Sequence, residues 1–190
     1  MLFSFDGNGG GIVDLRTTLQ SVQGNNPRSI SFMIQTTVTS DARILYTGSF
    51  EVWNYFGICI NCEGGASGKL VIDSWGGWYF SSTGKIVNDG LWHTVLITYD
   101  GTTLSIYVDG RLDNTATNWN AGSTATIAST LNTIGNSANY LGQSANGATH
   151  RWPGKLKNVL FYDYVITNSY ALANSYQAAA TILYTSGKVS

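Results

Sequence analysis

The sequence predicts an all-β fold, an antiparallel two-sheet β-sandwich of the jelly-roll type with one short C-terminal helix. Apolar and polar residues alternate with a period of two along most of the chain, as they do in strands that bury one face. Turn residues, among them 22 glycines, separate these short runs, and only 2 prolines occur. A length of 190 residues suits one domain, so we take residues 1–190 as a single domain and expect it to be part of a larger protein or assembly.

The first strands follow from alternation alone. Residues 2–6 already alternate, and Ile30, Phe32 and Ile34 share one face of the strand predicted at 29–35. The same pattern predicts strands at 43–47, 55–60 and 69–73.

The strongest signal lies in the middle of the chain, where alternating runs at 92–99, 104–108 and 111–112 are separated by Asp100-Gly101 and Asp109-Gly110. Asp-Gly between such runs is typical of a tight type I′ hairpin turn, because both residues tolerate a positive φ. The segment from Trp92 to Leu112 is therefore predicted to be a three-stranded antiparallel meander.

The last third of the chain contains a further predicted strand at 155–164. A short helix is expected at 168–180, where apolar residues recur at helical spacing. Two polar stretches rich in Gly, Asn and Ser, 117–126 and 135–153, lack alternation and are predicted to be long loops, which often carry function.

Charge and hydropathy exclude several classes of partner. Lys and Arg number 10 against 11 Asp and Glu, a net charge of −1, so the chain lacks the basic surface that nucleic-acid binding requires. No apolar run approaches the roughly 20 residues of a membrane span, so no membrane insertion is expected. The strand-like start at Leu2 leaves no room for a secretory signal, which favours a domain cut from a longer protein or a virion component.

Cys59 and Cys62 are the only cysteines. With just two histidines, His93 and His150, far apart in the chain, they do not make a zinc site. Our first interpretation is that they are two unbridged, small apolar side chains at the end of a strand. The alternative is a disulfide that closes the intervening turn.

Together these elements resemble the laminin-G-like domains of the concanavalin A-like lectin and glucanase jelly rolls. The most specific string is 91–110, which opens with Leu91-Trp92-His93 and contains both Asp-Gly pairs. Phe5-Asp6-Gly7 resembles the opening of the family, and Trp152-Pro153-Gly154 resembles the start of its last strand. The resemblance spans nearly the full chain and implies two antiparallel sheets packed face to face, with the termini close together.

The resemblance also raises the question of calcium, because relatives often carry one Ca²⁺ ion. Relatives often have acids in the last strand where this chain has Lys157-Asn158, so that position offers no acidic ligand here. No loop spaces its acids regularly, so we predict no dedicated metal site or cofactor, and regard one Ca²⁺ as the only ion that could bind. Two groups of oxygen ligands could hold it: Asp6 with Asn8 and Gly9, or Asp73 with Asn88 and Asp89.

The same architecture hosts glucanases and polysaccharide lyases, whose catalytic residues form recognisable patterns. Retaining glycoside hydrolysis requires two carboxylates about 5–5.5 Å apart. The jelly-roll glucanases place them as Glu-x-Asp-x-x-Glu, but neither Glu51 nor Glu63 is followed by that pattern. The Gln-Ile-His string of the lyases is absent. His93 is expected to be a packed structural histidine, and His150 has no partner that would make it a general base. We therefore predict that the domain is not an enzyme.

Aromatic residues are more numerous than one core of this size requires: 6 Trp, 11 Tyr and 7 Phe. Several lie at predicted strand ends, beside Asn, Gln or Asp. A flat ring can stack on the C–H face of a sugar while neighbouring polar groups bind its hydroxyls. The candidate ligand-binding residues are Trp75, Trp78, Trp119, Tyr140 and Trp152.

We therefore expect a non-catalytic, lectin-like recognition and adhesion module on an extracellular or virion surface, with a glycan or cell-surface polysaccharide as its partner. Stacking and neutral hydrogen bonds predict weak binding that is nearly independent of salt and is strengthened by several copies in one assembly. The alternative is a structural domain of a virus particle or surface fibre that contacts other copies or a scaffold protein. A polysaccharide lyase or glycoside hydrolase is the third interpretation.

Overall fold

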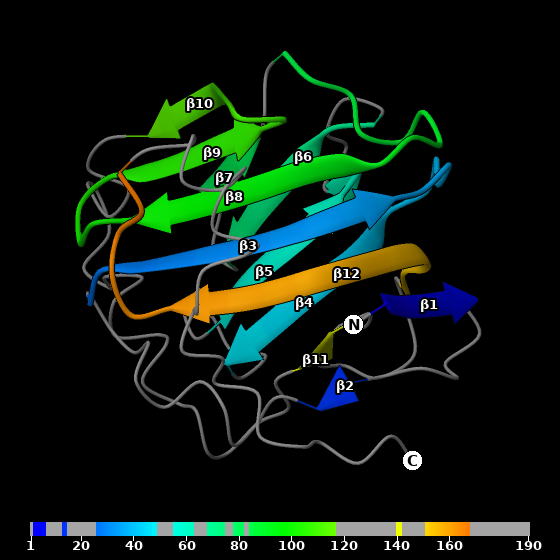
Figure 1. Cartoon of the computed structure of the whole chain (residues 1–190), viewed down its shortest axis with the longest axis horizontal. Helices are drawn as coiled ribbons and strands as arrows, with labels where there is room; N and C mark the ends of the chain where they lie inside the picture. Colours follow the sequence, from blue (N-terminus) through cyan, green and yellow to red (C-terminus); the bar gives the residue numbers. More distant parts are fainter. Residues whose placement is uncertain are drawn as a thin grey trace.

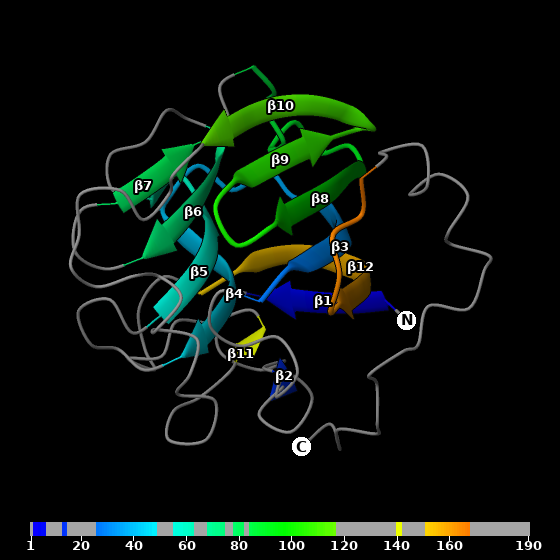
Figure 2. The ribbon, with the colours of Figure 1, turned by 90° about the vertical axis from the view of Figure 1, so that its left-hand side faces the viewer.

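A computed structural model of the chain describes residues 2–6, 13–14, 26–48, 55–62, 68–74, 78–81, 84–116, 140–141 and 151–167. Within these residues, twelve strands form two six-stranded antiparallel sheets (Figure 1). The two sheets pack face to face (Figure 2), which confirms the predicted sandwich. The described part of the chain contains no helix that could cross a membrane.

We call the two layers sheet A and sheet B. Sheet A contains, in spatial order, β1 (Leu2–Asp6), β12 (Pro153–Tyr162), β3 (Arg28–Gln35), β8 (His93–Tyr99), β9 (Leu104–Val108) and β10 (Arg111–Ala116). Sheet B contains β2 (Val13–Asp14), β11 (Tyr140–Leu141), β4 (Ala42–Gly48), β5 (Tyr55–Ile60), β6 (Leu70–Ser74) and β7 (Trp78–Ser81).

The core lies between the two sheets and is built from the alternating apolar positions. Ile30, Phe32 and Ile34 of β3 are buried in it, as the alternation predicts. Their register partners in β8 include Ile97 and Val95, so large apolar side chains from neighbouring strands meet on one face. Sheet B contributes the alternate residues of β5 and β6 in the same way.

The two Asp-Gly pairs form different turns. Asp109 and Gly110 both have positive φ, 51° and 76°, which confirms the predicted two-residue turn between β9 and β10. The other turn is not tight, because β8 ends at Tyr99 and β9 begins only at Leu104. There the Asp100 carboxylate accepts hydrogen bonds from the amides of Thr102 and Thr103, at 2.8 and 2.7 Å, and this bonding stabilises a longer loop.

Other sequence predictions differ from the structure at the ends of the sheets. The short strands β7 and β11 were not predicted, and β12 begins at Pro153, inside a stretch predicted to be a loop. The expected C-terminal helix at 168–180 and the loop at 117–126 lie outside the described residues.

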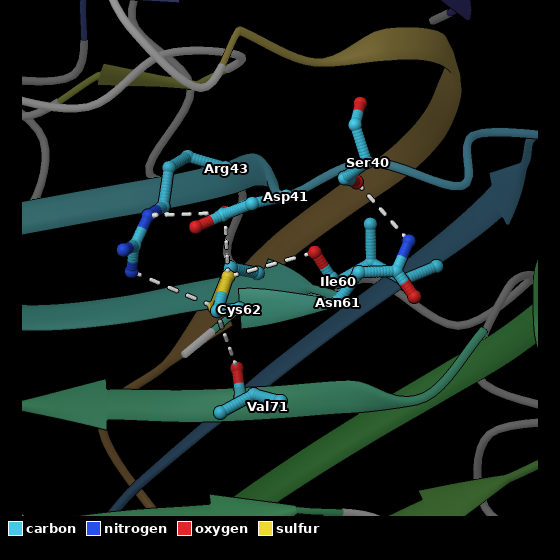
Figure 3. Close-up of a disulfide and its surroundings, with 8 residues drawn as sticks. Ser40, Asp41, Arg43, Ile60, Asn61, Cys62 and Val71 are labelled. Carbon is cyan, nitrogen blue, oxygen red and sulfur yellow. Dashed lines mark hydrogen bonds and ion pairs between the residues drawn. A yellow bond between two sulfur atoms is a disulfide. The ribbon is translucent and has the colours of Figure 1, made fainter. Parts of the chain in front are cut away.

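Cys59 and Cys62 form a disulfide, so our first interpretation of two unbridged thiols is wrong and the alternative holds (Figure 3). Both residues are buried, on the side of sheet B that faces away from the core. Arg43 Nη1 lies 3.5 Å from Cys59 Sγ, and Asp41 Oδ1 lies 3.0 Å from Cys62 Sγ. The bridge closes the turn at Asn61, whose φ of 58° is in the left-handed region. The side-chain Nδ2 of Asn61 donates to the carbonyls of Val38 and Ser40.

The segment that follows β12 covers part of the outer face of sheet A. Ser29 Oγ donates to the Tyr164 carbonyl at 2.8 Å and accepts from the Ile166 amide at 2.9 Å. Ile166 packs with Leu96 and Tyr162 in a small cluster outside the main core. One buried hydroxyl therefore holds the segment against β3, and Figure 1 shows it running past the ends of β3 and β8.

Replacing that hydroxyl should loosen the segment. In Ser29→Ala the Ile166 amide and the Tyr164 carbonyl lose a shared partner, so we expect the free energy of unfolding in urea to fall by about 1–3 kcal/mol. Ser105→Ala is the matched control, because its hydroxyl lies 3.4 Å from the exposed Thr115 hydroxyl, and it should change stability by less than about 0.5 kcal/mol. An equal fall in the free energy of unfolding in the two variants would contradict this role of Ser29.

Candidate functional site

One row of residues crosses the whole of sheet B. Tyr140 pairs with Asp14 on one side and with Tyr46 on the other, and the pairing continues through the remaining strands. We call these six positions the cross-sheet row: from β2 to β7 they are Asp14, Tyr140, Tyr46, Gly57, Asp73 and Tyr79. With neighbouring strands about 4.8 Å apart, the row extends over about 24 Å.

The cross-sheet row lies on the face of sheet B that points away from sheet A. Ile58 and Ile72, the neighbours of Gly57 and Asp73 in sequence, belong to the core between the sheets. Because successive residues of a strand alternate between faces, the row falls on the outer side. Two residues further along β5, the same face carries Cys59 and its disulfide.

The residue types of the cross-sheet row suit a polar, hydroxylated ligand. Its three tyrosines each combine a flat apolar ring with a hydroxyl, and its two aspartates accept hydrogen bonds. Gly57, in the middle of the row, has no side chain and its backbone is buried.

The structure brings only some of the predicted aromatic residues near this row. Tyr140 belongs to it. Trp78 lies in β7 opposite Ser74, two residues from the pair formed by Phe80 and the core residue Ile72. The register therefore puts position 78 on the side that faces sheet A, so Trp78 and Tyr140 are on opposite faces. Trp75 and Trp119 lie outside the described residues, as does His150.

The prediction that the Trp152 ring stacks on a ligand is wrong. Trp152 has an exposed fraction of 0%, and it belongs to the core between the sheets. Gly154 explains the close packing, because a Cβ at that position would come within 2.6 Å of the Trp152 ring. A ring with no exposed face cannot stack on a sugar.

Only Tyr140 of the row was predicted as a ligand-binding residue. Asp14 and Gly57 were missed, and so were Tyr46, Asp73 and Tyr79. Their side-by-side placement results from the register of β4 to β7, which depends on the pairing of four strands. The only sequence signal for them is a polar or aromatic residue at an outward position of each predicted strand, and that signal does not reveal which positions line up.

His93 has the structural role that the sequence predicts. It is 3% exposed, with Nδ1 2.8 Å from Asp109 Oδ2 and Nε2 2.9 Å from Asp89 Oδ1. Lys85 Nζ lies 3.4 Å from the same Asp109 oxygen, and Asp109 Oδ1 also accepts from the Thr94 amide. Two carboxylates do converge here, but a buried imidazole fills the space between them. This cluster connects the β9–β10 turn to the loop before β8.

Hydrogen bonding lowers the pKa of both carboxyl groups. For Asp89 the largest cause is the hydrogen bond from the Leu91 amide, followed by that from His93. For Asp109 partial burial is the largest influence and acts to raise the pKa, but the hydrogen bonds from His93 and Thr94 outweigh it. Both groups are thus held as carboxylates in the folded protein.

Neither calcium position gains support from the described residues. They contain no group of three His, Cys, Asp or Glu side chains that could hold a metal ion. Asp89 is bonded to His93, and the Asn88 amide nitrogen donates to the Val38 carbonyl. Asn8 and Gly9, the expected partners of Asp6, lie outside the described part of the chain. A Ca²⁺ site stays a prediction from the sequence.

These features define a two-sheet β-sandwich of the lectin type. The family model of the concanavalin A-like lectin/glucanases superfamily, in its laminin-G-like form, matches residues 6–170. The chain belongs to this superfamily, which confirms the resemblance seen in the sequence. No curated protein sequence matches it.

Solved structures share the fold at low sequence identity. Domains LG4-5 of the mouse laminin α1 chain match with a TM-score of 0.60 and 18% identity, over 86% of this chain and 42% of that one. The CBM40 domain of the Ruminococcus gnavus IT-sialidase, bound to α2,3 sialyllactose, matches with a TM-score of 0.65 and 12% identity, over 92% and 97%. Domain 4 of AbnA, a GH43 extracellular arabinanase from Geobacillus stearothermophilus in complex with arabinotriose, matches with a TM-score of 0.57 and 15% identity, over 80% and 67%.

Some of these matches involve much longer chains. This chain spans 42% of the laminin fragment and only 27% of the NanB sialidase of Streptococcus pneumoniae. At such identities the likeness establishes the fold alone.

The acid cluster around His93 makes stability dependent on pH. The folded protein lowers the pKa values of Asp89 and Asp109. Their contribution to the free energy of unfolding is therefore complete above the ordinary carboxyl pKa of about 3.9, and it is lost as the pH falls through the lower pKa values of the folded state. We expect Asp109→Asn to be less stable than the wild type at pH 7 and to lose less further stability on acidification. Urea unfolding at pH 7, 4 and 3 measures both effects.

Asp163→Asn is the control for this experiment, since Asp163 is exposed and makes no hydrogen bond to the residues that the structure describes. It should follow the wild-type pH dependence. If acidification lowers the free energy of unfolding of Asp109→Asn as much as that of the wild type, the cluster does not stabilise the fold.

Proposed function

We propose that this chain is a carbohydrate-binding module and that its ligand lies along the cross-sheet row of sheet B. The single observation that carries the proposal is the alignment of three tyrosines, two aspartates and a central glycine across one outer face. Two solved structures with this fold contain sugars, sialyllactose in the CBM40 domain and arabinotriose in the arabinanase domain. Those ligands belong to those proteins, and they support a glycan as the class of ligand here.

The proposed mechanism combines stacking with hydrogen bonds. Tyr46 and Tyr140 offer rings for the apolar faces of sugars, and Asp73 offers acceptors for their hydroxyls. Trp75 and Trp119 remain candidates for further contacts, whereas Trp78 occupies a position on the opposite face of sheet B. Such contacts are individually weak, so several copies on one assembly would strengthen attachment to a cell-surface polysaccharide.

We propose that the module is not catalytic. In the described residues, Asp89 and Asp109 converge on buried His93 and do not face each other across an open space. This arrangement does not leave room between them for a glycosidic bond and a water molecule.

We further propose that the module acts outside the cell or on a virion surface. The Cys59–Cys62 disulfide supports this location, because disulfides persist mainly in oxidising environments. A soluble polysaccharide or a glycan on another cell is the partner that such a location would provide.

Substitutions in the row test the function. We expect Tyr46→Ala to weaken glycan binding about 3- to 10-fold through loss of a stacking ring. Asp73→Ala should weaken it about tenfold or more through loss of charged acceptors. A glycan array identifies the ligand, and isothermal titration calorimetry at 50 and 500 mM NaCl then measures affinity, which should change little with salt for a neutral glycan.

Tyr164→Ala is the matched control, because Tyr164 is 54% exposed and lies beyond the end of β12 in sheet A. It should bind as the wild type does. Glycan binding that survives both Tyr46→Ala and Asp73→Ala would refute the row as the site, and the absence of any glycan ligand would refute the function itself.

A further inference from the structure

A hollow of about 320 Å³ opens at one end of sheet A, where β3 ends and β12 begins. It lies on the outer face of that sheet, because its residue Lys155 precedes the core residue Leu156 in β12. In register, Lys155 lies between Ser4 of β1 and Gln35 of β3. The hollow is therefore separate from the cross-sheet row, which belongs to the other sheet.

Hydrogen bonds fix the walls of the hollow to one another. Gln35 Nε2 donates to the Gly90 carbonyl at 2.9 Å, and the Gly90 amide donates to the Thr36 carbonyl at 2.9 Å. Thr36 Oγ1 donates to the Pro153 carbonyl at 3.0 Å. Three segments that are distant in sequence are thus held together before any ligand arrives, which reduces the entropy cost of binding.

One of the lining residues, Gly154, is closely packed. It packs directly on the edge of the Trp152 ring, where a Cβ would come within 2.7 Å of Cε2. A Cβ at Gly154 would also lie 3.0 Å from the Gln35 carbonyl oxygen. Any larger residue at this position would have to displace the buried tryptophan.

The described residues of the lining combine polar and apolar surface, and Lys155 is the charged residue among them. Ser4 and Thr37 contribute hydroxyls, Lys155 contributes an ammonium group, and no carboxylate belongs to the lining. No carboxylate of the described residues pairs with Lys155, whereas the neighbouring Lys157 has its ammonium 4.8 Å from the centre of the Trp92 ring. Asp6, the register partner of Pro153, lies beside the hollow and is not part of its lining.

We propose that this hollow binds one anionic sugar residue, with its carboxylate or sulfate on the Lys155 ammonium. The hydroxyls of Ser4 and Thr37 bond to the ring hydroxyls of the sugar, and Gln35 Oε1 accepts from one of them. This is a second glycan site on the opposite sheet. It differs from the cross-sheet row in requiring a negative charge, so its affinity falls as salt rises.

Oligogalacturonate and its fully methyl-esterified form test the proposal, because they present the same sugars with and without the charge. The wild-type domain is titrated with each at 50 and 300 mM NaCl, and binding is followed by the amide NMR signals of Ser4, Thr37 and Gly90. Dextran sulfate and dextran form a second pair that distinguishes sulfate from carboxylate as the anion. We expect only the anionic member of a pair to shift these signals, and to do so more weakly at the higher salt.

Lys155→Gln should weaken this binding about tenfold or more, and Lys155→Arg should retain it. Arg111→Gln, which removes one exposed positive charge from the opposite edge strand of sheet A, should bind as the wild type does. Tyr46→Ala should also bind as the wild type does, so a failure here is distinguishable from a failure of the cross-sheet row. Since Lys155 is exposed, its variants should keep the wild-type melting temperature within a few degrees.

Three results would overturn the proposal. One is unchanged binding in Lys155→Gln, the second is equal binding of the charged and uncharged members of both pairs, and the third is no shift at Ser4, Thr37 and Gly90 with either anionic probe.

Discussion

Each strand of a two-sheet sandwich can bury only one face, because successive side chains point to opposite sides of the sheet. In this protein the inner faces are filled by alternating apolar residues such as Ile30, Ile58 and Ile97. Polar and charged residues of the strands must then lie on the outer faces or at strand ends. The cross-sheet row and the hollow beside Lys155 both follow from this constraint, since each consists of residues that alternate with core positions.

The elements best predicted from the sequence are those whose cause is local. The turn at Asp109-Gly110 depends on the φ preferences of two adjacent residues, and the strand at Ile30 to Ile34 depends on its own alternation. Asp100-Gly101 has the same residue types but forms a longer loop, because the Asp100 side chain bonds to the amides that follow it. The strand β11 is only two residues long and exists through its pairing with β2 and β4, so its own sequence could not predict it.

The functional residues were harder to predict because they are brought together by pairing between distant strands. Tyr140 was predicted from its residue type and neighbours, but its alignment with Tyr46 and Asp73 follows from the order of strands in sheet B. The neighbours Arg151 and Pro153 predict an exposed position for Trp152. The absence of a side chain at Gly154 is what allows its ring to be buried. Residue type is therefore an inadequate guide to exposure where a strand begins.

β1 is the outermost strand of sheet A and is held through its pairing with β12. Terminal edge strands open locally with a smaller free-energy cost than strands in the middle of a sheet. If these five residues fray, Ser4 no longer lines the hollow, while the core between the sheets stays intact. Occupancy of the hollow and protection of the β1 amides from hydrogen exchange are consequently coupled, each favouring the other.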